Sequence, residues 1–284
     1  MKNKCLSLLF APLVLLSQTP YLTNIHHTIN AQQRLNTNLL LSTIWTHQDE
    51  DLTIDPSFLY TSTDDGDIIS SSLALTGAND EDELKMKSLL EYSYDDHKHS
   101  KSRSHNVSGG LSALLKTPLS IFAGLSGGAN FNTLQSLVDY KQYYASGALG
   151  LGYDIPLLDD TTRLTPIAYL NYTFLQLQNH KGLETIPTQH YNHLSVNAGL
   201  IAQTLFGSMQ INLYGIYSHS VLDNTLHLAT DTQRFKLDSA QWLVNLGANL
   251  GFYGDDMSFK LGLSSEISKN FYNVGLTSSV GFEF

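Results

Sequence analysis

The sequence predicts an all-β protein: a transmembrane, antiparallel, up-and-down β-barrel of about twelve strands, preceded by a signal peptide. The last residues, 271–284, alternate between apolar and polar side chains, which is the period of a β-strand with one apolar face. Aromatic residues on the apolar parity recur ten residues apart, as in Trp242 and Phe252. Ten residues of tilted strand span roughly 25 Å, the height of the apolar band of a membrane barrel. No apolar run is long enough for a helical membrane span.

The first residues predict a secretory signal peptide over residues 1–20. Lys2 and Lys4 precede the short apolar run Leu6–Leu16, although no clear cleavage site follows this run. The single cysteine, Cys5, lies before the run, whereas a lipoprotein cysteine would follow it. The sequence therefore predicts no lipid anchor, and the processed chain would contain no disulfide.

The rest of the chain divides into a lead segment and a barrel. Residues 21–36 are polar without a clear period, so they form either a lead segment or a short helix inside the lumen. Residues 37–284 are predicted to form the barrel, and residues 56–62 compete with its first two strands. The predicted strands are 37–47, 67–76, 84–95, 104–116, 118–128, 141–154, 163–176, 191–206, 208–220, 240–253, 256–268 and 271–284.

The connections between these strands alternate between long and short, apart from the last one. Outer-membrane barrels have short periplasmic turns and longer extracellular loops. The alternation therefore predicts that the chain enters its first strand from the periplasm and that both termini lie there. An even number of strands lets the first strand pair with the last, which leaves no exposed edge.

The alternation assigns side chains to the two faces of the barrel wall. Aromatic residues on the lipid-facing parity are expected to anchor the barrel at the membrane interfaces: Tyr143, Tyr153, Tyr172, Trp242, Phe252, Tyr272, Phe282 and Phe284. Charged residues on the opposite parity are expected to line the lumen: Lys85, Lys87, Glu91, Asp95, Lys260, Glu266 and Glu283. Such charges either line a water-filled pore or pair with an occluding segment, for example residues 18–36 folded as a helix.

One short stretch has the spacing of a lipid-cleaving site. His193-Leu194-Ser195, with Asn197 beyond it, resembles the His-x-Ser pair and asparagine of outer-membrane phospholipase A. Leu194 and Val196 hold the lipid-facing parity, so His193 and Ser195 point into the lumen, away from a membrane substrate. We therefore predict that these residues line the lumen, and we predict no catalytic residue, cofactor or metal.

The polar segment 97–105 is predicted to be an extracellular loop with three histidines and three basic residues. These residue types suit lipopolysaccharide phosphates, host polyanions or a transition metal, and a solvated polar loop is the simpler alternative. The acidic run 80–83 is predicted to be a charged turn, with weak calcium binding as its alternative. The formal charge of −10 argues against nucleic acid as a partner.

Three short motifs point to one family. Leu164–Tyr172 matches an L-x-P-x-A-x-L-x-Y strand, Tyr214–His219 matches a Y-x-x-x-x-H stretch, and Val280–Phe284 ends the chain on an aromatic residue. From about Val107 to its end, the chain resembles the translocator, or β-domain, of autotransporter proteins. The resemblance implies a Gram-negative outer-membrane barrel that acts as a pore or scaffold for the export of an N-terminal segment.

The same resemblance implies partners and leaves alternatives open. The implied partners are outer-membrane lipid, lipopolysaccharide and, through the C-terminal strand, the barrel-assembly machinery, and the protein is expected to be a monomer. About 20 residues separate the predicted signal from the first predicted strand, so no large passenger is expected. A stand-alone small porin, a surface adhesin and a lipid hydrolase are the alternative functions.

Overall fold

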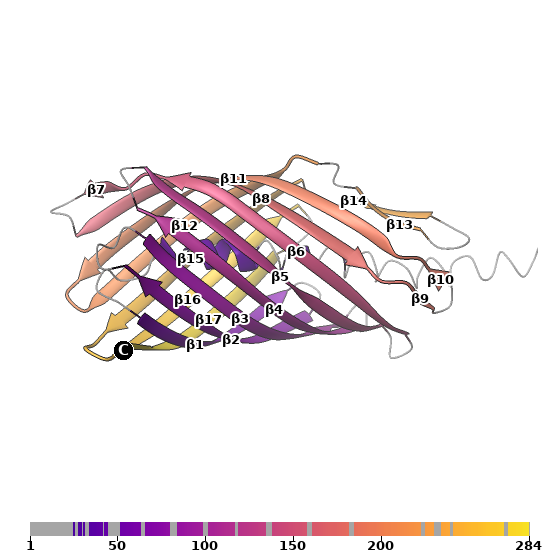
Figure 1. Ribbon diagram of the computed structural model, residues 1–284, viewed down its shortest axis with the longest axis horizontal. Helices are drawn as coiled ribbons and strands as arrows, with labels where there is room; N and C mark the ends of the chain where they lie inside the picture. The colour runs from indigo at the N-terminus through magenta and orange to yellow at the C-terminus, as the bar shows by residue number, and fades with distance from the viewer. Residues whose placement is uncertain are drawn as a thin grey trace, which may run out of the picture.

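Twelve strands form one closed antiparallel wall in the computed structural model (Figure 1). Each strand of the wall pairs with the next along the chain, and β1 pairs with β17 to close the ring. The wall strands are β1 (Leu52–Thr63), β2 (Gly66–Ala78), β3 (Leu84–His97), β4 (Ser102–Leu115), β5 (Ser120–Leu134), β6 (Val138–Gly152), β8 (Thr162–Leu177), β11 (Gln189–Phe206), β12 (Met209–Ser220), β15 (Trp242–Tyr253), β16 (Met257–Ser268) and β17 (Tyr272–Glu283). The structure describes residues 25, 28–29, 31, 34–41, 43–44, 52–63, 66–79, 84–98, 102–116, 119–134, 138–157, 161–181, 185–222, 225–229, 234–238, 241–269 and 272–283.

Five shorter strands lie in the connections of the wall. β7 (Ile155–Leu157) pairs with β8, β9 (His180–Lys181) with β10 (Thr185–Ile186), and β13 (Thr225–Ala229) with β14 (Arg234–Asp238). The β9–β10 and β13–β14 hairpins lie at the end of the barrel away from the C-terminus, which we term the distal end (Figure 1).

A helix lies inside the ring of strands (Figure 1). Every described residue between 25 and 44 is helical. No helix in the described part of the chain has the length and apolar content needed to cross a bilayer.

The wall has an apolar outer face and a polar inner face. Large apolar side chains such as Leu125 and Leu149 are 68% and 61% exposed on the outside. The opposite parity of the same strands is buried and rich in serine, threonine and asparagine. A soluble β-sandwich would instead bury its apolar faces against each other. The predicted transmembrane barrel is thus confirmed, including the outward direction of its apolar parity.

The strand predicted over residues 37–47 was wrong. The described residues of this segment, 37–41 and 43–44, are helical, and the first strand is β1, which contains the competing segment 56–62. Residues 39–41 are three consecutive leucines, which fit the period of a strand and that of a helix equally well. A helix satisfies its own backbone hydrogen bonds, so it can lie inside a ring whose strands already use theirs.

Two predicted loops were too long. Residues 129–140 were predicted as a loop, but β5 continues to Leu134 and β6 begins at Val138. The loop predicted over 97–105 shortens in the same way, because β3 ends at His97 and β4 begins at Ser102. These strand ends are mostly polar, so the apolar alternation within them is too short to predict a strand. The connections β8–β11 and β12–β15, which hold the two hairpins, are long as predicted.

The occupied lumen as the candidate functional site

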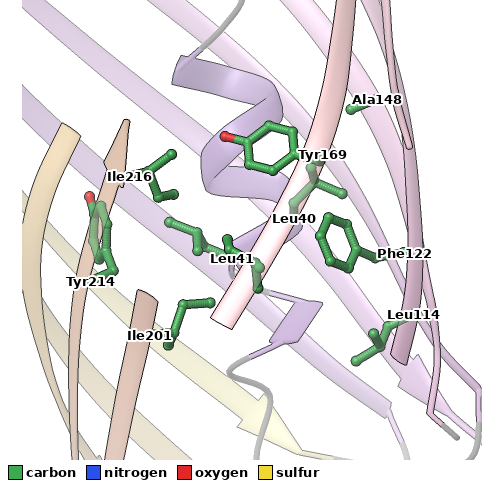
Figure 2. Close-up of a cluster of buried hydrophobic side chains, with 10 residues drawn as sticks. Leu40, Leu41, Leu114, Phe122, Ala148, Tyr169, Ile201, Tyr214 and Ile216 are labelled. Carbon is green, nitrogen blue, oxygen red and sulfur yellow. The ribbon is translucent and has the colours of Figure 1, made fainter. Parts of the chain in front are cut away.

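The helix packs against an apolar patch on the inner face of the wall (Figure 2). Leu40 and Leu41 are both buried in this contact. The patch collects inward side chains from six neighbouring strands: Leu114, Phe122, Ala148, Ile167, Tyr169, Ile201, Tyr214 and Ile216. Large apolar residues on the lumen-facing parity are out of place in a water-filled barrel. Their presence is explained by a resident helix whose apolar side they cover.

Asn36 is the polar anchor of the helix in the lumen. Its side chain is fully buried, and its Nδ2 donates to Ser146 Oγ at 2.6 Å and to Asn171 Oδ1 at 2.9 Å. Ser126 Oγ donates to Asn36 Oδ1 at 2.5 Å. The three partners come from β5, β6 and β8, so one helical side chain is bonded to three wall strands. A buried amide with its bonds satisfied fixes both the depth and the rotation of the helix.

Threonines along the helix make further contacts with the wall. Thr28 Oγ1 donates to Gln142 Oε1 at 2.7 Å, and the Thr37 hydroxyl lies 2.9 Å from Tyr169 Oη. The hydroxyl of Thr43 is hydrogen-bonded to that of Ser112 on β4. These contacts extend from one end of the helix to the other, so the helix is held along its length.

Arg34 is the positive charge of the helix that faces the acidic part of the wall. Its Nη1 lies 3.8 Å from Glu266 Oε2 on β16, and both side chains are largely buried. Asn273 Nδ2 also donates to the Glu266 carboxylate. Glu91 and Asp95 on β3 interact electrostatically with the same guanidinium. The acidic residues of this region therefore surround a cation supplied by the helix, and the sequence analysis missed Arg34.

The charges predicted to line the lumen fall into separate groups. Lys85, Lys87, Glu91, Lys260 and Glu266 lie on the inner parity of the wall, with Glu283 half-buried where β17 ends. Glu91 and Glu266 approach Arg34, whereas Lys260 Nζ lies 3.4 Å from Asp55 Oδ1. Lys85 lines a different cavity, near Ile44, so the predicted charges do not form one site.

The helix leaves part of the lumen open. A cavity of about 210 Å³ lies beside it, lined by Leu35 and Asn38 of the helix and by small polar residues of β1, β2, β16 and β17. Asp55, Lys87, Glu91 and Lys260 supply charges to this cavity. The apolar half of the inner wall thus holds the helix, and the serine-rich half faces a polar space.

The two ends of the helix lie at opposite ends of the barrel. Ile25 is buried in a cluster with Tyr140, Leu177 and Leu228, which belong to the distal end. Ile44 lines a cavity with Lys116 and Leu205, which lie at the end where β17 finishes. The helix therefore runs the length of the lumen before the chain turns into β1.

The predicted anchoring aromatics lie on the outer face. Tyr143, Tyr153, Tyr172, Trp242, Phe252, Tyr272 and Phe282 are all exposed there, and Phe284 lies outside the described residues. Tyr172 Oη donates to Asn192 Oδ1 at 2.6 Å across the outer surface, as a tyrosine at a wet interface can. This placement suits side chains that sit between hydrocarbon and water.

The residues with the phospholipase-like spacing face the lumen. Ser195 and Asn197 are buried, and His193 Nε2 lies 3.2 Å from Ser220 Oγ. Ser195 Oγ lies 3.5 Å from Asn197 Oδ1. The polar groups of this triplet point away from the lipid, as expected for lumen-lining residues.

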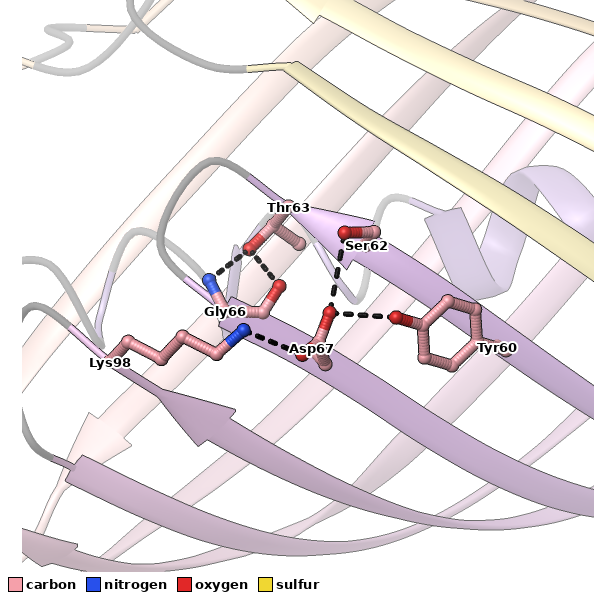
Figure 3. A network of polar contacts seen from close by, with 6 residues as sticks. All are labelled: Tyr60, Ser62, Thr63, Gly66, Asp67 and Lys98. Carbon is pink, nitrogen blue, oxygen red and sulfur yellow. Dashed lines mark hydrogen bonds and ion pairs between the residues drawn. The ribbon is translucent and has the colours of Figure 1, made fainter.

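The basic segment 97–105 does not converge on one ligand position. His97 is buried in the lumen, whereas His105 lies on the outer face, where its Nδ1 is 2.8 Å from Tyr92 Oη. Lys98 Nζ instead lies 2.9 Å from Asp67 Oδ2 (Figure 3), and this bond holds the pKa of Lys98 above its ordinary value. In the described part of the chain, no three histidine, cysteine or acidic side chains are placed to hold a metal.

Comparisons with known proteins agree with this geometry. The model of the autotransporter beta-domain family matches residues 30–264. The translocator domain of autotransporter NalP from Neisseria meningitidis is 14% identical, with a TM-score of 0.70 over 92% of this chain and 98% of that one. The beta domain of the Bordetella autotransporter BrkA is 14% identical, with a TM-score of 0.57 over 83% and 100% of the two chains.

A third solved structure shares the fold. The transport unit of the autotransporter AIDA-I from Escherichia coli is 9% identical, with a TM-score of 0.54 over 88% of this chain and 97% of that one. A search of curated protein sequences gave no match. The family match covers most of the chain, from the helix to β16. The chain belongs to the autotransporter beta-domain family.

Proposed function

We propose that this protein is an outer-membrane translocator whose barrel exports the segment that precedes the helix and then retains the helix in its lumen. Family membership implies insertion in the outer membrane. The observation that carries the proposal is the position of the helix, which crosses the lumen with Ile25 and Ile44 at opposite ends. A segment attached before Ile25 would therefore leave the barrel at the distal end.

The connections support an orientation of the barrel in the membrane. Outer-membrane barrels have short turns on the periplasmic side. The connections β11–β12 and β15–β16 are short and lie at the end of β17, whereas the two hairpins lie at the distal end. We infer that β17 ends in the periplasm and that Ile25 lies at the extracellular mouth. One helix and twelve strands then cross the membrane, which differs from the expectation that both ends of the chain are periplasmic.

The proposed function also includes partners of the barrel wall. The exposed apolar and aromatic outer face suits outer-membrane lipid and lipopolysaccharide. We infer that β17, with outward Val274, Leu276 and Phe282, is the strand presented to the barrel-assembly machinery, and that one barrel functions as a monomer. The helix occupies the lumen where a porin would hold water, and the polar residues of the inner wall serve to hold it.

Surface display of an inserted epitope tests this proposal. An epitope placed between residues 24 and 25 of the full chain is expected to be labelled by antibody on intact cells. The same epitope placed in the short β11–β12 turn, between Gly207 and Ser208, is expected to be labelled only after the outer membrane is opened. Labelling of the first epitope only after opening would contradict export through this barrel.

A further inference from the structure

The hairpin β13–β14 lies at the distal end of the barrel (Figure 1), and its Leu228 belongs to the same buried cluster as the end of the helix. Within β13, His227 is exposed and the next residue, Leu228, is fully buried. Leu228 belongs to a cluster that includes Ile25 and Ile29 of the helix. The other members come from the wall and from the β9–β10 hairpin: Tyr140, Tyr144, Leu175, Leu177, Ile186 and Tyr191. Leu228 of the hairpin is thus buried against the end of the helix and the mouth of the barrel.

Side chains of β11 form hydrogen bonds with the backbone of the hairpin. Gln189 Nε2 donates to the carbonyl oxygen of Ala229 at 2.8 Å, and Gln189 Oε1 accepts from the Ala229 N–H at 2.9 Å. Tyr191 Oη donates to the carbonyl oxygen of His227 at 2.9 Å. These three bonds end on side chains of β11 and do not belong to the ladder of the barrel wall. The attachment can therefore open without breaking the barrel.

Burial of Leu228 depends on the helix being in place. Ile25 is fully buried and Ile29 nearly so, and both contribute apolar surface to the cluster that covers Leu228. A lumen without the helix would leave that side of the cluster to water, which weakens the apolar contact of the hairpin. If the seated helix favours closure of the hairpin, the closed hairpin favours the seated helix by the same factor.

We propose that β13–β14 is a latch that closes the extracellular mouth when the helix is seated, with Gln189 and Tyr191 as the residues that hold it closed. This inference rests on the proposed function, because it assigns the helix to the lumen after export. While another segment occupies the lumen, Leu228 lacks the isoleucines of the helix and the latch is open. Once the helix is seated, the closed latch slows its return.

Hydrogen exchange of the full chain in detergent micelles tests the latch, with mass spectrometry to locate the protected amides. Gln189→Ala is expected to speed exchange of the β13 and β14 amides at least tenfold while residues 34–41 stay protected. Ile29→Asn is expected to speed exchange of the same two strands, because it weakens the helix side of the cluster. Gln176→Ala is the matched control, since Gln176 lies on the outer face of β8 at the same end. A heat-modifiable band on a gel confirms that each variant barrel is folded.

The outcomes separate the latch from the proposed function. Slow exchange of β13 and β14 that Ile29→Asn leaves unchanged would show that closure does not depend on the helix, and it would overturn the latch. Fast exchange of the hairpin in the unmodified chain, with residues 34–41 protected, would overturn the latch and leave the translocator intact. Fast exchange of residues 34–41 in the unmodified chain would overturn both, because the helix would not be seated.

Discussion

Replacing Arg34 by alanine is expected to unseat the helix. Arg34 is the cation beside the buried carboxylate of Glu266, with Glu91 and Asp95 also near it. Removing one partner of a buried ion pair leaves the other charge without compensation, which costs about 3 kcal/mol or more. About 3 kcal/mol corresponds to a roughly 100-fold higher ratio of unseated to seated helix. Planar-bilayer recordings should show this change as more frequent openings to the conductance of the empty barrel.

Three further variants test whether the loss of the positive charge of Arg34 causes the openings. Arg34→Lys keeps the positive charge and should restore most of the closed time. The double variant Arg34→Ala with Glu266→Gln should also be closed more often than Arg34→Ala alone, because the carboxylate that pairs with Arg34 is then replaced by an uncharged amide. Lys98→Ala serves as a surface control, since the Lys98–Asp67 pair is exposed and should leave the recordings unchanged. Recordings of Arg34→Ala that match those of the unmodified protein would contradict this role.

Asn36→Leu is expected to loosen the helix by a similar free energy, because it removes buried hydrogen bonds and not a charge. Leucine has the same number of side-chain heavy atoms as asparagine but no polar ones, so the hydroxyls of Ser126 and Ser146 and the amide of Asn171 lose a buried partner. A buried polar group left unsatisfied costs about 1–3 kcal/mol. The expected result is a loss of hydrogen-exchange protection over residues 34–41 by at least a factor of ten.

Asn38 provides the matched control for Asn36. It lies two residues further along the helix, is exposed, and faces the polar cavity beside the helix. Asn38→Leu makes the same replacement of an amide by an apolar side chain, but it leaves the buried bonds to β5, β6 and β8 intact. Equal losses of protection in the two variants would show that the helix is not held by the Asn36 bonds.

The wall of the barrel could be predicted from the sequence because each strand carries its own signal. In β17, for example, Val274 and Leu276 lie outside and Asn273 lies inside, and the period of two shows this without knowledge of any neighbour. The strand β1 was harder to predict from the sequence, because Leu59 is an apolar residue on the inward parity and Pro56 interrupts the apolar residues of the outward parity. Strand ends past the apolar band are mostly polar, and in residues 130–133 Phe131 is the one apolar side chain, so the alternation is too short to predict a strand.

The contents of the lumen could not be predicted in the same way. The bonds of Asn36 join residues 90 or more positions apart in the sequence, and no local pattern marks their partners. Arg34 was missed because the surrounding segment is polar without a period. One signal was present: Phe122, Ile167 and Ile201 are large apolar residues on the polar parity. Apolar side chains that face a lumen indicate an apolar occupant, and this would have favoured the plugged barrel over the open pore.

A disulfide between the helix and the wall tests the central claim most directly. The hydroxyls of Thr43 and Ser112 are hydrogen-bonded, which places their β-carbons close enough for a disulfide. In a full chain carrying Cys5→Ser, the pair Thr43→Cys and Ser112→Cys is expected to form this bond on mild oxidation, so that maleimide labels neither thiol until reductant is added. Thr43→Cys with Ser108→Cys is the control, because Ser108 lies on the same inner face of β4 about 13 Å further along the strand. Oxidised thiols in the first pair and free thiols in the second are the predicted result; free thiols in both pairs would contradict a helix seated in the lumen.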